Sequence, residues 1–463
     1  MDIIFSRGSI QLGFRDGTSE NYKSTINLPV NADQAFSIVF NDAQGKVLTV
    51  LDQGGHEVRT IDVTALPGLQ MKDGFLPERK LYLGVSSAPR STLTLSSPSL
   101  RQVPTGKMVT ATVESGLRKL AAQKGISIGT EWTPWKMRDK RFWEIMTNDF
   151  TTVQISEFSC QKDFWRGRKD YNFERADRAT DIAIGQGWKV RASHLVWGVR
   201  VNEESCAPPE WLSKGNFSRQ EYIQILEEHV KTVVTHFKGR VTEWSIANEA
   251  ISRSFCKGCD FWGEKIGPEY IEMVFRWAKE SDPSGILIFN ETENHSPSYP
   301  HSQRIIAKLF STTKELKAKG APIDAIGMHM HLLAPWYDQT PPKKEDVINT
   351  MRMFAELGVD IYITELDVNL QNVTGTQQER WEYQAKIYRD VIEACLESKV
   401  CKSFDTWGLS DAVSWYTIGC TGCPNQPNSD PLMFDKEYRP KPAYFAVRDT
   451  LVGKPTFTPT PKP

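Results

Sequence analysis

The feature that most constrains the fold is a regular alternation of short apolar segments with amphipathic helical segments, which begins near residue 108. The apolar segments of strand length are SIGTEW, TTVQISEF, KVRASHLVW, EWSIANE, LIFNETE, AIGMHMH, IYITELDV and FDTWGLSD. The helical segments between them include FSRQEYIQILEEHVKTVVTHF, PEYIEMVFRWAKE, SQRIIAKLFSTTKELKAKG and QQERWEYQAKIYRDVIEACLES. Eight such alternations over roughly 340 residues predict an α/β fold, a (β/α)8 TIM barrel with loop insertions.

The first part of the chain, residues 1–103, has a different pattern. Short apolar runs such as SIQLGF, AFSIVF and KVLTVL are separated by turn sequences such as DG, DAQG and QGG. This spacing predicts a small all-β, sandwich-like domain, with either an accessory carbohydrate-binding role or a purely structural one. The barrel is then expected over residues 104–452. Residues 453–463, rich in Thr and Pro, are expected to form either a linker stub or a frayed tail.

Charge and hydropathy exclude several classes of partner. The formal net charge is -1, with 56 Lys and Arg against 57 Asp and Glu. This balance gives no reason to expect nucleic acid or an anionic membrane surface as a partner. No run of about 18 apolar residues is present, so no transmembrane helix is expected. The first residues, MDIIFSRGSIQLGF, lack the basic region and apolar core of a secretory signal peptide.

Ionisable side chains gather where the predicted strands end, which is where a barrel of this kind has its active site. The fourth strand ends in Asn248 and Glu249, and the seventh ends in Glu365. Two carboxyl groups at two strand ends are what cleavage of a glycosidic bond needs, because one protonates the leaving oxygen while the other attacks carbon or activates water. The alternative is that both are ordinary surface carboxylates.

Several segments resemble glycoside hydrolase family 10, the family of many endo-β-1,4-xylanases. WSIANEA (244–250) and YITELDV (362–368) resemble its two catalytic strands. The other similar segments, in the same order as in the family, are KVRASHLVW, AIGMHMH, DTWGLSDAVSWY and PLMFDKEYRPKPAYFAV. The resemblance spans roughly residues 127–448 and implies a retaining hydrolase of β-1,4-linked xylan or xylo-oligosaccharides, with no cofactor and no metal.

The resemblance also implies roles for individual residues. Glu249 would be the general acid/base and Glu365 the nucleophile, and the charge of Glu365 would help to raise the pKa of Glu249. Asn248 would bind the 2-hydroxyl of the reacting sugar, and His331 would orient Glu365. The side chains expected to wall the sugar cleft are Trp197, Trp407 and Trp415.

The sequence departs from the family pattern at positions that bind the sugar on the non-reducing side. Ser193 stands where the family usually has His, and His329 stands where it usually has Gln. Glu157 falls where the second strand usually carries Asn. These three positions are therefore expected to bind substrate in an altered way. A different β-glycan or a short β-glycoside is the alternative substrate, and a non-catalytic carbohydrate-binding protein is a more distant alternative.

The chain has eight cysteines. Cys395 and Cys401 stand where many secreted members of the family carry a disulfide, which implies an oxidising, extracellular compartment. The pairs Cys256/Cys259 and Cys420/Cys423 leave disulfides, a zinc site and free thiols open, while Cys160 and Cys206 could pair across neighbouring loops. The oligomeric state is not determined by the sequence.

Overall fold

The computed structural model describes two parts of the chain, and each is described here by itself. The first part comprises residues 2–6, 9–14, 24–29, 37–40, 47–51 and 57–62, all in strands. The second comprises residues 116–132, 140–159, 161–198, 208–334, 340–418 and 426–453. The chain divides into two compact units, residues 1–112 and residues 113–463.

The N-terminal unit contains two three-stranded antiparallel sheets. The first is formed by β1 (Asp2–Ser6), β2 (Ser9–Phe14) and β3 (Ser24–Pro29). The second is formed by β4 (Ser37–Phe40), β5 (Val47–Leu51) and β6 (Glu57–Asp62). Short apolar runs separated by turn residues favour such consecutive pairing. That this unit is a packed sandwich with an accessory role stays a prediction.

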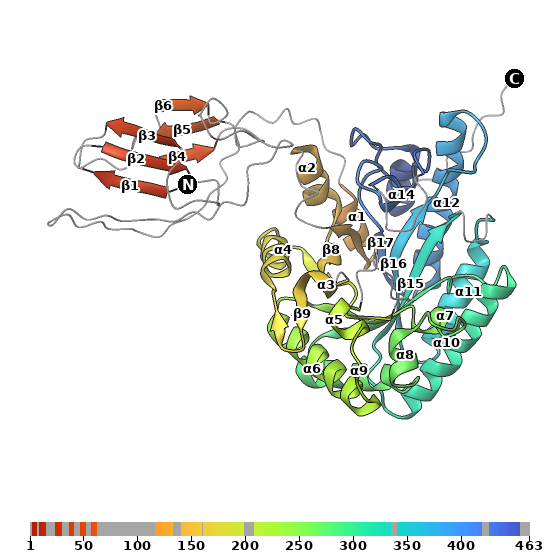
Figure 1. The fold of residues 1–463 in the computed structure, drawn as a ribbon. Helices are drawn as coiled ribbons and strands as arrows, with labels where there is room; N and C mark the ends of the chain where they lie inside the picture. The colour runs from red at the N-terminus through yellow and green to blue at the C-terminus, as the bar shows by residue number, and fades with distance from the viewer. Residues whose placement is uncertain are drawn as a thin grey trace, which may run out of the picture. The chain divides into compact units, whose positions relative to one another are not determined.

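The second unit is a closed barrel of parallel strands (Figure 1). Its strands are β7 (Ser127–Trp132), β8 (Thr152–Ile155), β11 (Lys189–Ala192), β12 (Val196–Trp197), β13 (Glu243–Asn248), β14 (Ile286–Thr292), β15 (Ala325–Leu332), β16 (Asp360–Val368) and β17 (Cys401–Thr406). The pairing of β17 with β7 and of β11 with β13 closes the ring. Since β11 and β12 both pair with β13, they are two pieces of one strand, and the barrel has the predicted eight.

Helices follow the strands and cover the barrel (Figure 1). The longer ones are α1 (Leu117–Gln123), α2 (Lys140–Asp149), α4 (Glu174–Gly185), α6 (Arg219–Phe237), α9 (Tyr270–Ser281), α10 (Pro300–Ala318), α11 (Lys344–Ala355), α12 (Gln377–Ser398) and α14 (Pro442–Val452). Capping boxes begin α6, at Ser218 with Glu221, and α12, at Thr376 with Glu379. Each box satisfies backbone N–H groups that a helix start leaves unpaired, which fixes where these helices begin.

Short elements lie in the loops at the strand ends. They are η3 (Ser156–Phe158), α3 (Gln161–Phe164), β9 (Trp165–Gly167), β10 (Asp170–Tyr171), α5 (Glu210–Ser213), α7 (Ala250–Arg253), α8 (Phe261–Lys265) and α13 (Trp415–Ile418). The predicted linker, from residue 454 onward, lies outside the described residues. Of the predicted strands, the second ends earlier than expected, at Ile155, and the third is interrupted at Ser193–Leu195.

An ion-pair cluster fills part of the barrel interior. Arg191 on β11 donates to Glu243 on β13, with Nε 2.8 Å from Oε2, and also to Asp405 on β17. All three side chains are buried. Burial raises the pKa of Asp405 to about 6, although Arg191 opposes that shift. Because the cluster ties together three strands of the barrel, its role is structural, and it differs from the acidic groups at the strand ends.

Candidate active site

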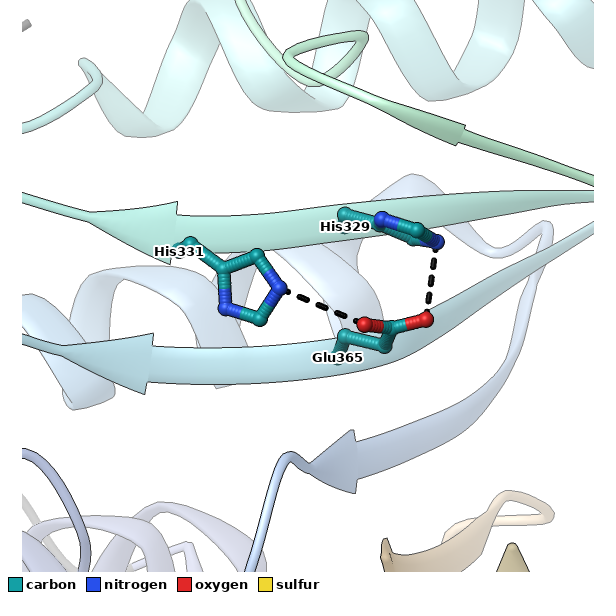
Figure 2. A group of neighbouring side chains, drawn as sticks. All are labelled: His329, His331 and Glu365. Atoms are coloured by element: carbon teal, nitrogen blue, oxygen red, sulfur yellow. Dashed lines mark hydrogen bonds and ion pairs between the residues drawn. The ribbon is translucent and has the colours of Figure 1, made fainter. Parts of the chain in front are cut away.

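Glu365 lies near the end of β16 and is almost completely buried, with 2% of its surface exposed. In the parallel ladder, Glu365 is the partner of His329 on β15. The Nε2 atom of His329 lies 2.8 Å from Oε1 of Glu365, and Nε2 of His331 lies 3.2 Å from Oε2. Figure 2 shows the two rings directed at different oxygens of the same carboxylate. A third histidine, His194, places Nε2 3.2 Å from Oε1.

These histidines determine the charge state of Glu365. Burial by itself would raise the pKa of this carboxyl group. The neighbouring His329 and His194 oppose that effect, and hydrogen bonds from His329 and His331 add to the opposition. The pKa of Glu365 is therefore held well below 4.5, and the side chain is a carboxylate at neutral pH. An ionised, desolvated carboxylate of this kind suits a nucleophile.

His331 is held in place by a second carboxylate. Its Nδ1 atom lies 2.8 Å from Oδ2 of Asp367, which also accepts from Nε1 of Trp415 at 2.9 Å. The hydroxyl of Tyr416 donates to the other oxygen of Asp367 at 3.1 Å. Burial lowers the pKa of His331, but Asp367 and Glu365 outweigh burial and raise it to about 10. His331 is thus a cation that donates to Asp367 through Nδ1 and to Glu365 through Nε2.

Glu249 follows β13 directly, in a left-handed backbone conformation with φ 52°. Its N–H donates to the carbonyl of Asn290 at 3.0 Å. Oε2 of Glu249 accepts from Nε1 of Trp197 at 3.1 Å and from Nε of Arg253 at 2.7 Å. Oε1 faces Nδ1 of His329 at 3.8 Å. The carboxylate of Glu249 thus lies between Arg253 and His329, which in turn contacts Glu365.

The expectation of a raised pKa for Glu249 is wrong for the protein without substrate. Burial is the largest influence and does raise this pKa, and Glu365 also raises it. However, the charge of Arg253, the charge of His329 and the hydrogen bond from Arg253 together outweigh both, so the pKa lies below 4.5. The sequence argument considered the repulsion between Glu249 and Glu365 but did not consider an arginine one helical turn later.

A buried amide connects the two glutamates. Nδ2 of Asn290, on β14, donates to Oδ1 of Asn248 at 2.9 Å and to Oε1 of Glu365 at 3.1 Å. Oδ1 of Asn290 accepts from the hydroxyl of Thr364 at 2.7 Å, which fixes the orientation of the amide. Nδ2 of Asn248 is buried and has no hydrogen-bond partner among the described residues. A buried donor without a partner is costly, so this N–H is suited to bind a ligand oxygen.

Most of the predicted site residues lie around the two glutamates. The two exceptions among the described residues are Ser193 and Glu157, for which no contact with either glutamate is observed. Trp407 stacks on His194, with ring centroids 5.7 Å apart, and Trp415 packs on His331 at 5.0 Å. Ser193 is fully buried and its hydroxyl donates to Oε1 of Gln154 at 3.0 Å, so the hydroxyl is engaged within the barrel. Glu157 is buried in the turn η3 that follows β8.

Sequence reasoning missed four residues that shape the site: His194, Asn290, Arg253 and Glu291. His194 follows Ser193 and carries the imidazole that the family pattern places one residue earlier, so the shifted histidine was a detectable signal. Glu291 accepts the backbone N–H of Ile251 at 2.7 Å and so anchors the turn after Glu249. The contacts of Asn290 and Glu291 had no signal in the sequence beyond the place of both residues at a strand end.

A small hollow opens beside His329 and His331. The other residues that line it are Thr292, Glu293, His295, Ser298, Tyr299, Leu332, Thr340 and Pro342. The side chains are mostly polar and come from the ends of β14 and β15 and from the loops that follow, so they can form hydrogen bonds with hydroxyl groups. The hollow adjoins two of the three histidines that contact Glu365, so it extends the site along these loops.

His329, His331 and Glu365 are also of the residue types that bind metal ions. One ligand atom from each lies within 4.8 Å of the others. In the protein, Nε2 of each histidine already contacts an oxygen of Glu365 (Figure 2). The contacts therefore fit histidines that orient and stabilise a carboxylate.

Two cysteine pairs lie at disulfide distance. Cys395, in α12, is bonded to Cys401, which begins β17, as the resemblance implied. Cys256 is bonded to Cys259 in the loop after α7, which fits the local disulfide among the alternatives for this pair. Cys160, Cys206, Cys420 and Cys423 lie outside the described residues, so their predicted arrangements stay predictions.

Comparison with known proteins agrees with this arrangement. The family model described as Glycosyl hydrolase family 10 matches residues 116–450. Endo-1,4-beta-xylanase B of Thermotoga neapolitana is 34% identical over 340 residues, which are 73% of this chain and 90% of the relative. Native xylanase 10B from Thermotoga maritima is 32% identical, with a TM-score of 0.64 over 73% of this chain and 98% of that one.

A further solved structure contains a sugar. Xylanase 10B from Thermotoga petrophila RKU-1, in complex with xylobiose, is 32% identical to this chain, with a TM-score of 0.63. The match covers 73% of this chain and 97% of that one. Together with the family model, these similarities confirm the predicted resemblance. The chain belongs to glycoside hydrolase family 10.

Proposed function

We propose that this glycoside hydrolase cleaves β-1,4-linked xylan or xylo-oligosaccharides with retention, using Glu365 as nucleophile and Glu249 as general acid/base. The observation that carries the assignment is the position of the two glutamates. Each lies at the C-terminal end of a barrel strand, and Oε1 of Glu249 faces the His329 ring that is bound to Glu365. Relatives named endo-1,4-beta-xylanase B and xylanase 10B support xylan as the substrate.

In the proposed reaction, Glu365 attacks the anomeric carbon while Glu249 gives a proton to the departing glycosidic oxygen. A covalent glycosyl ester forms on Glu365. Glu249, now ionised, removes a proton from water, and the water attacks the anomeric carbon and releases Glu365. His331 and His329 stabilise the carboxylate that leaves in this second step, because both donate to Glu365 when it is ionised.

The sugar in the reacting position would contact Asn248, His194 and Trp407. The unpartnered N–H of Asn248 is available for the 2-hydroxyl of that sugar. Trp407 and Trp415 supply aromatic surfaces next to His194 and His331, and pyranose rings stack well on such surfaces. Ser193 does not contribute a side-chain contact in this scheme because its hydroxyl is bound to Gln154.

A second candidate substrate is a different β-glycan or a short β-glycoside. It is favoured by the replaced side chains around Glu365, where His329 stands in a position that usually carries Gln and the hydroxyl of Ser193 is bound to Gln154. A non-catalytic binding role is disfavoured, because both glutamates are present at the strand ends and Glu365 is bound by His329 and His331. Glu157, whose side chain is buried after β8, stays a proposed contact of the non-reducing side.

The cell location and the N-terminal unit complete the proposal. We place the protein outside the cell, since Cys395 and Cys401 form a disulfide that an oxidising compartment would maintain. Among the described residues, no helix has the length and apolar character to cross a membrane. The N-terminal unit is proposed to act as an accessory domain, either for binding carbohydrate or for structural support.

A panel of polysaccharides and oligosaccharides tests the substrate. Beechwood-type xylan, linear xylo-oligosaccharides, mixed-linkage glucan, cellulose and aryl β-glycosides would be incubated with the protein, and the products would be identified by chromatography. Release of xylo-oligosaccharides from xylan supports the proposal. Turnover confined to another glycan or to aryl glycosides would support the second candidate, and binding without any turnover would overturn both.

A further inference from the structure

The acid/base Glu249 is held by an arginine that the general mechanism does not require. Nε of Arg253 lies 2.7 Å from Oε2 of Glu249, and a second nitrogen of the guanidinium contacts the same oxygen. The Arg253 side chain is 29% exposed, so a ligand can reach it. A guanidinium at this distance favours the ionised form of Glu249, whereas the first chemical step needs the protonated form. This conflict has to be resolved when substrate binds.

Arg253 lies on the side of Glu249 that is turned away from His329. Oε1 of Glu249 is directed toward His329, which is bound to Glu365, whereas Oε2 is directed toward Arg253. The reacting sugar has to lie over Glu365, and the acid/base protonates the oxygen that joins this sugar to the leaving group. A side chain beyond Glu249, away from Glu365, therefore borders the part of the glycan that leaves.

The surface next to Arg253 suits an acidic sugar. Phe255, two residues later, is 42% exposed, which gives a pyranose ring an aromatic surface on which to stack. A second guanidinium, that of Arg304 on α10, lies over the Phe255 ring at 5.3 Å from its centroid. The nearby carboxylate of Glu293 is engaged by the hydroxyl of Tyr299 at 2.5 Å. An exposed aromatic ring with a guanidinium over it offers stacking together with charge-assisted hydrogen bonds.

We propose that Arg253 binds the carboxylate of a uronate side group on the leaving part of the glycan, and thereby releases Glu249. The inference rests on the roles proposed above for Glu249 and Glu365. In this exchange the guanidinium replaces one carboxylate partner with another and so keeps its charge-assisted hydrogen bonds. Glu249 takes a proton from solvent and passes it to the glycosidic oxygen as that bond breaks. A neutral glycan has to separate Arg253 from Glu249 without offering a replacement.

The experiment compares two substrates that differ only in charge. One is a xylo-oligosaccharide with a glucuronate side group on the leaving part, and the other is the same compound with that carboxyl group reduced to a primary alcohol. The wild-type kcat/KM is expected to be at least about 10-fold higher for the uronate, as charge-assisted hydrogen bonds imply. In Arg253→Met the ratio falls to about one, and in Arg253→Lys it lies between these values.

A matched control is available on α9. Arg276 binds Glu272, four residues earlier, through the same two nitrogens, with Nε 2.9 Å and Nη2 2.8 Å from Oε1. Neither residue belongs to the site described above. Arg276→Met is expected to keep the wild-type ratio. The pH profile gives a second measurement, because on the neutral substrate the basic limb of Arg253→Met moves to higher pH once Glu249 loses its cation.

Two results would overturn the inference. One is a wild-type ratio near one. The other is a ratio that survives in Arg253→Met, which together with an equal loss on both substrates would show that Arg253 only orients Glu249. Thermal unfolding of each variant verifies that it is folded. Failure of the proposed function looks different, because wild-type protein would then hydrolyse neither compound and no xylan.

Discussion

His329 and Glu365 face each other across adjacent strands, with Nε2 of the histidine 2.8 Å from Oε1 of the glutamate. His194 reaches the same oxygen and His331 reaches the other, so three imidazoles surround one carboxylate. This arrangement lets a fully buried carboxylate remain ionised, since burial alone would favour its neutral form. The histidines therefore have a direct part in preparing the nucleophile.

The first prediction concerns the acidic limb of the pH profile. Glu365 has to be ionised to attack, so activity falls as the pH drops through its pKa. His329→Gln removes the largest of the influences that lower this pKa, and the acidic limb of kcat/KM should move to higher pH.

The lowered pKa of Glu365 also affects stability. A carboxyl group whose pKa is lower in the folded than in the unfolded protein stabilises the fold at pH values above the unfolded pKa, and this stability is lost as the pH falls. The variant should therefore lose less stability upon acidification.

A surface histidine provides the control for this prediction. His236 contacts Asp177, with Nε2 2.8 Å from Oδ1, and its side chain is 35% exposed. His236→Gln should leave the acidic limb of kcat/KM where it is in the wild type. An unchanged acidic limb in His329→Gln would contradict the role assigned to His329.

The second prediction tests the nucleophile. Glu365→Ala should lower kcat by at least about 10⁴-fold, by analogy with the removal of other enzymatic nucleophiles. Azide can enter the space left by the side chain and attack the anomeric carbon from the same face, so it should restore part of the turnover as a glycosyl azide. The measurement is product analysis by proton NMR. Glu365→Gln, which fills that space, serves as the control and should not be rescued.

The third prediction tests the acid/base. Glu249→Ala should slow hydrolysis of xylo-oligosaccharides by about 10²–10⁴-fold, because their leaving oxygens need a proton. Aryl glycosides with activated leaving groups do not need that proton, so their first step should proceed nearly as in the wild type. Stopped-flow release of the phenolate measures this step. Equal losses on both kinds of substrate would argue against Glu249 as the acid.

The fourth prediction concerns the disulfide between Cys395 and Cys401. It closes a short loop between the end of α12 and the start of β17, with a sequence separation of 6. Replacing both cysteines by Ala should lower the free energy of unfolding by roughly 2 kcal/mol, as the loop-entropy relation gives. Urea unfolding measures the change. Removing Cys256 and Cys259, whose sequence separation is 3, should cost less, and the reverse order would contradict the loop-entropy explanation.

The fifth prediction concerns the ion pairs inside the barrel. Arg191→Met would leave Glu243 and Asp405 buried without their cation, at a cost of about 3–5 kcal/mol in the free energy of unfolding. The pKa of Asp405, already about 6, would rise further. A raised carboxyl pKa means that stability is lost as the pH increases through it, so the deficit should be larger at pH 8 than at pH 5.

An exposed arginine is the matched control for Arg191. Arg166 pairs with Asp170 at 3.0 Å, with both side chains more than half exposed. Arg166→Met should change the free energy of unfolding by no more than about 1 kcal/mol, as is usual for surface ion pairs. Similar losses in the two variants would show that the Arg191 cluster does not depend on burial.

Much of the architecture could be predicted from local patterns. The alternation of short apolar segments with amphipathic helical segments located the barrel strands, and the strand-end rule then selected Glu249 and Glu365 from many acidic residues. The capping boxes at Ser218 and Thr376 are likewise readable as sequence motifs. These features depend on residues that are close together in the chain, so they are visible without knowledge of the fold.

The partners of the catalytic groups were decided by the tertiary structure. The sequence by itself determined that two glutamates lie at strand ends, because the apolar pattern and the family motifs predict those positions. The tertiary structure determined that His194, rather than Ser193, reaches Glu365. Both residues lie in the break between β11, which ends at Ala192, and β12, which begins at Val196. By contrast, the contact of Arg253 with Glu249 is local, because Arg253 lies one helical turn after it in α7. A pKa depends on charges within a few ångströms, and those distances exist only when the strands and loops have come together.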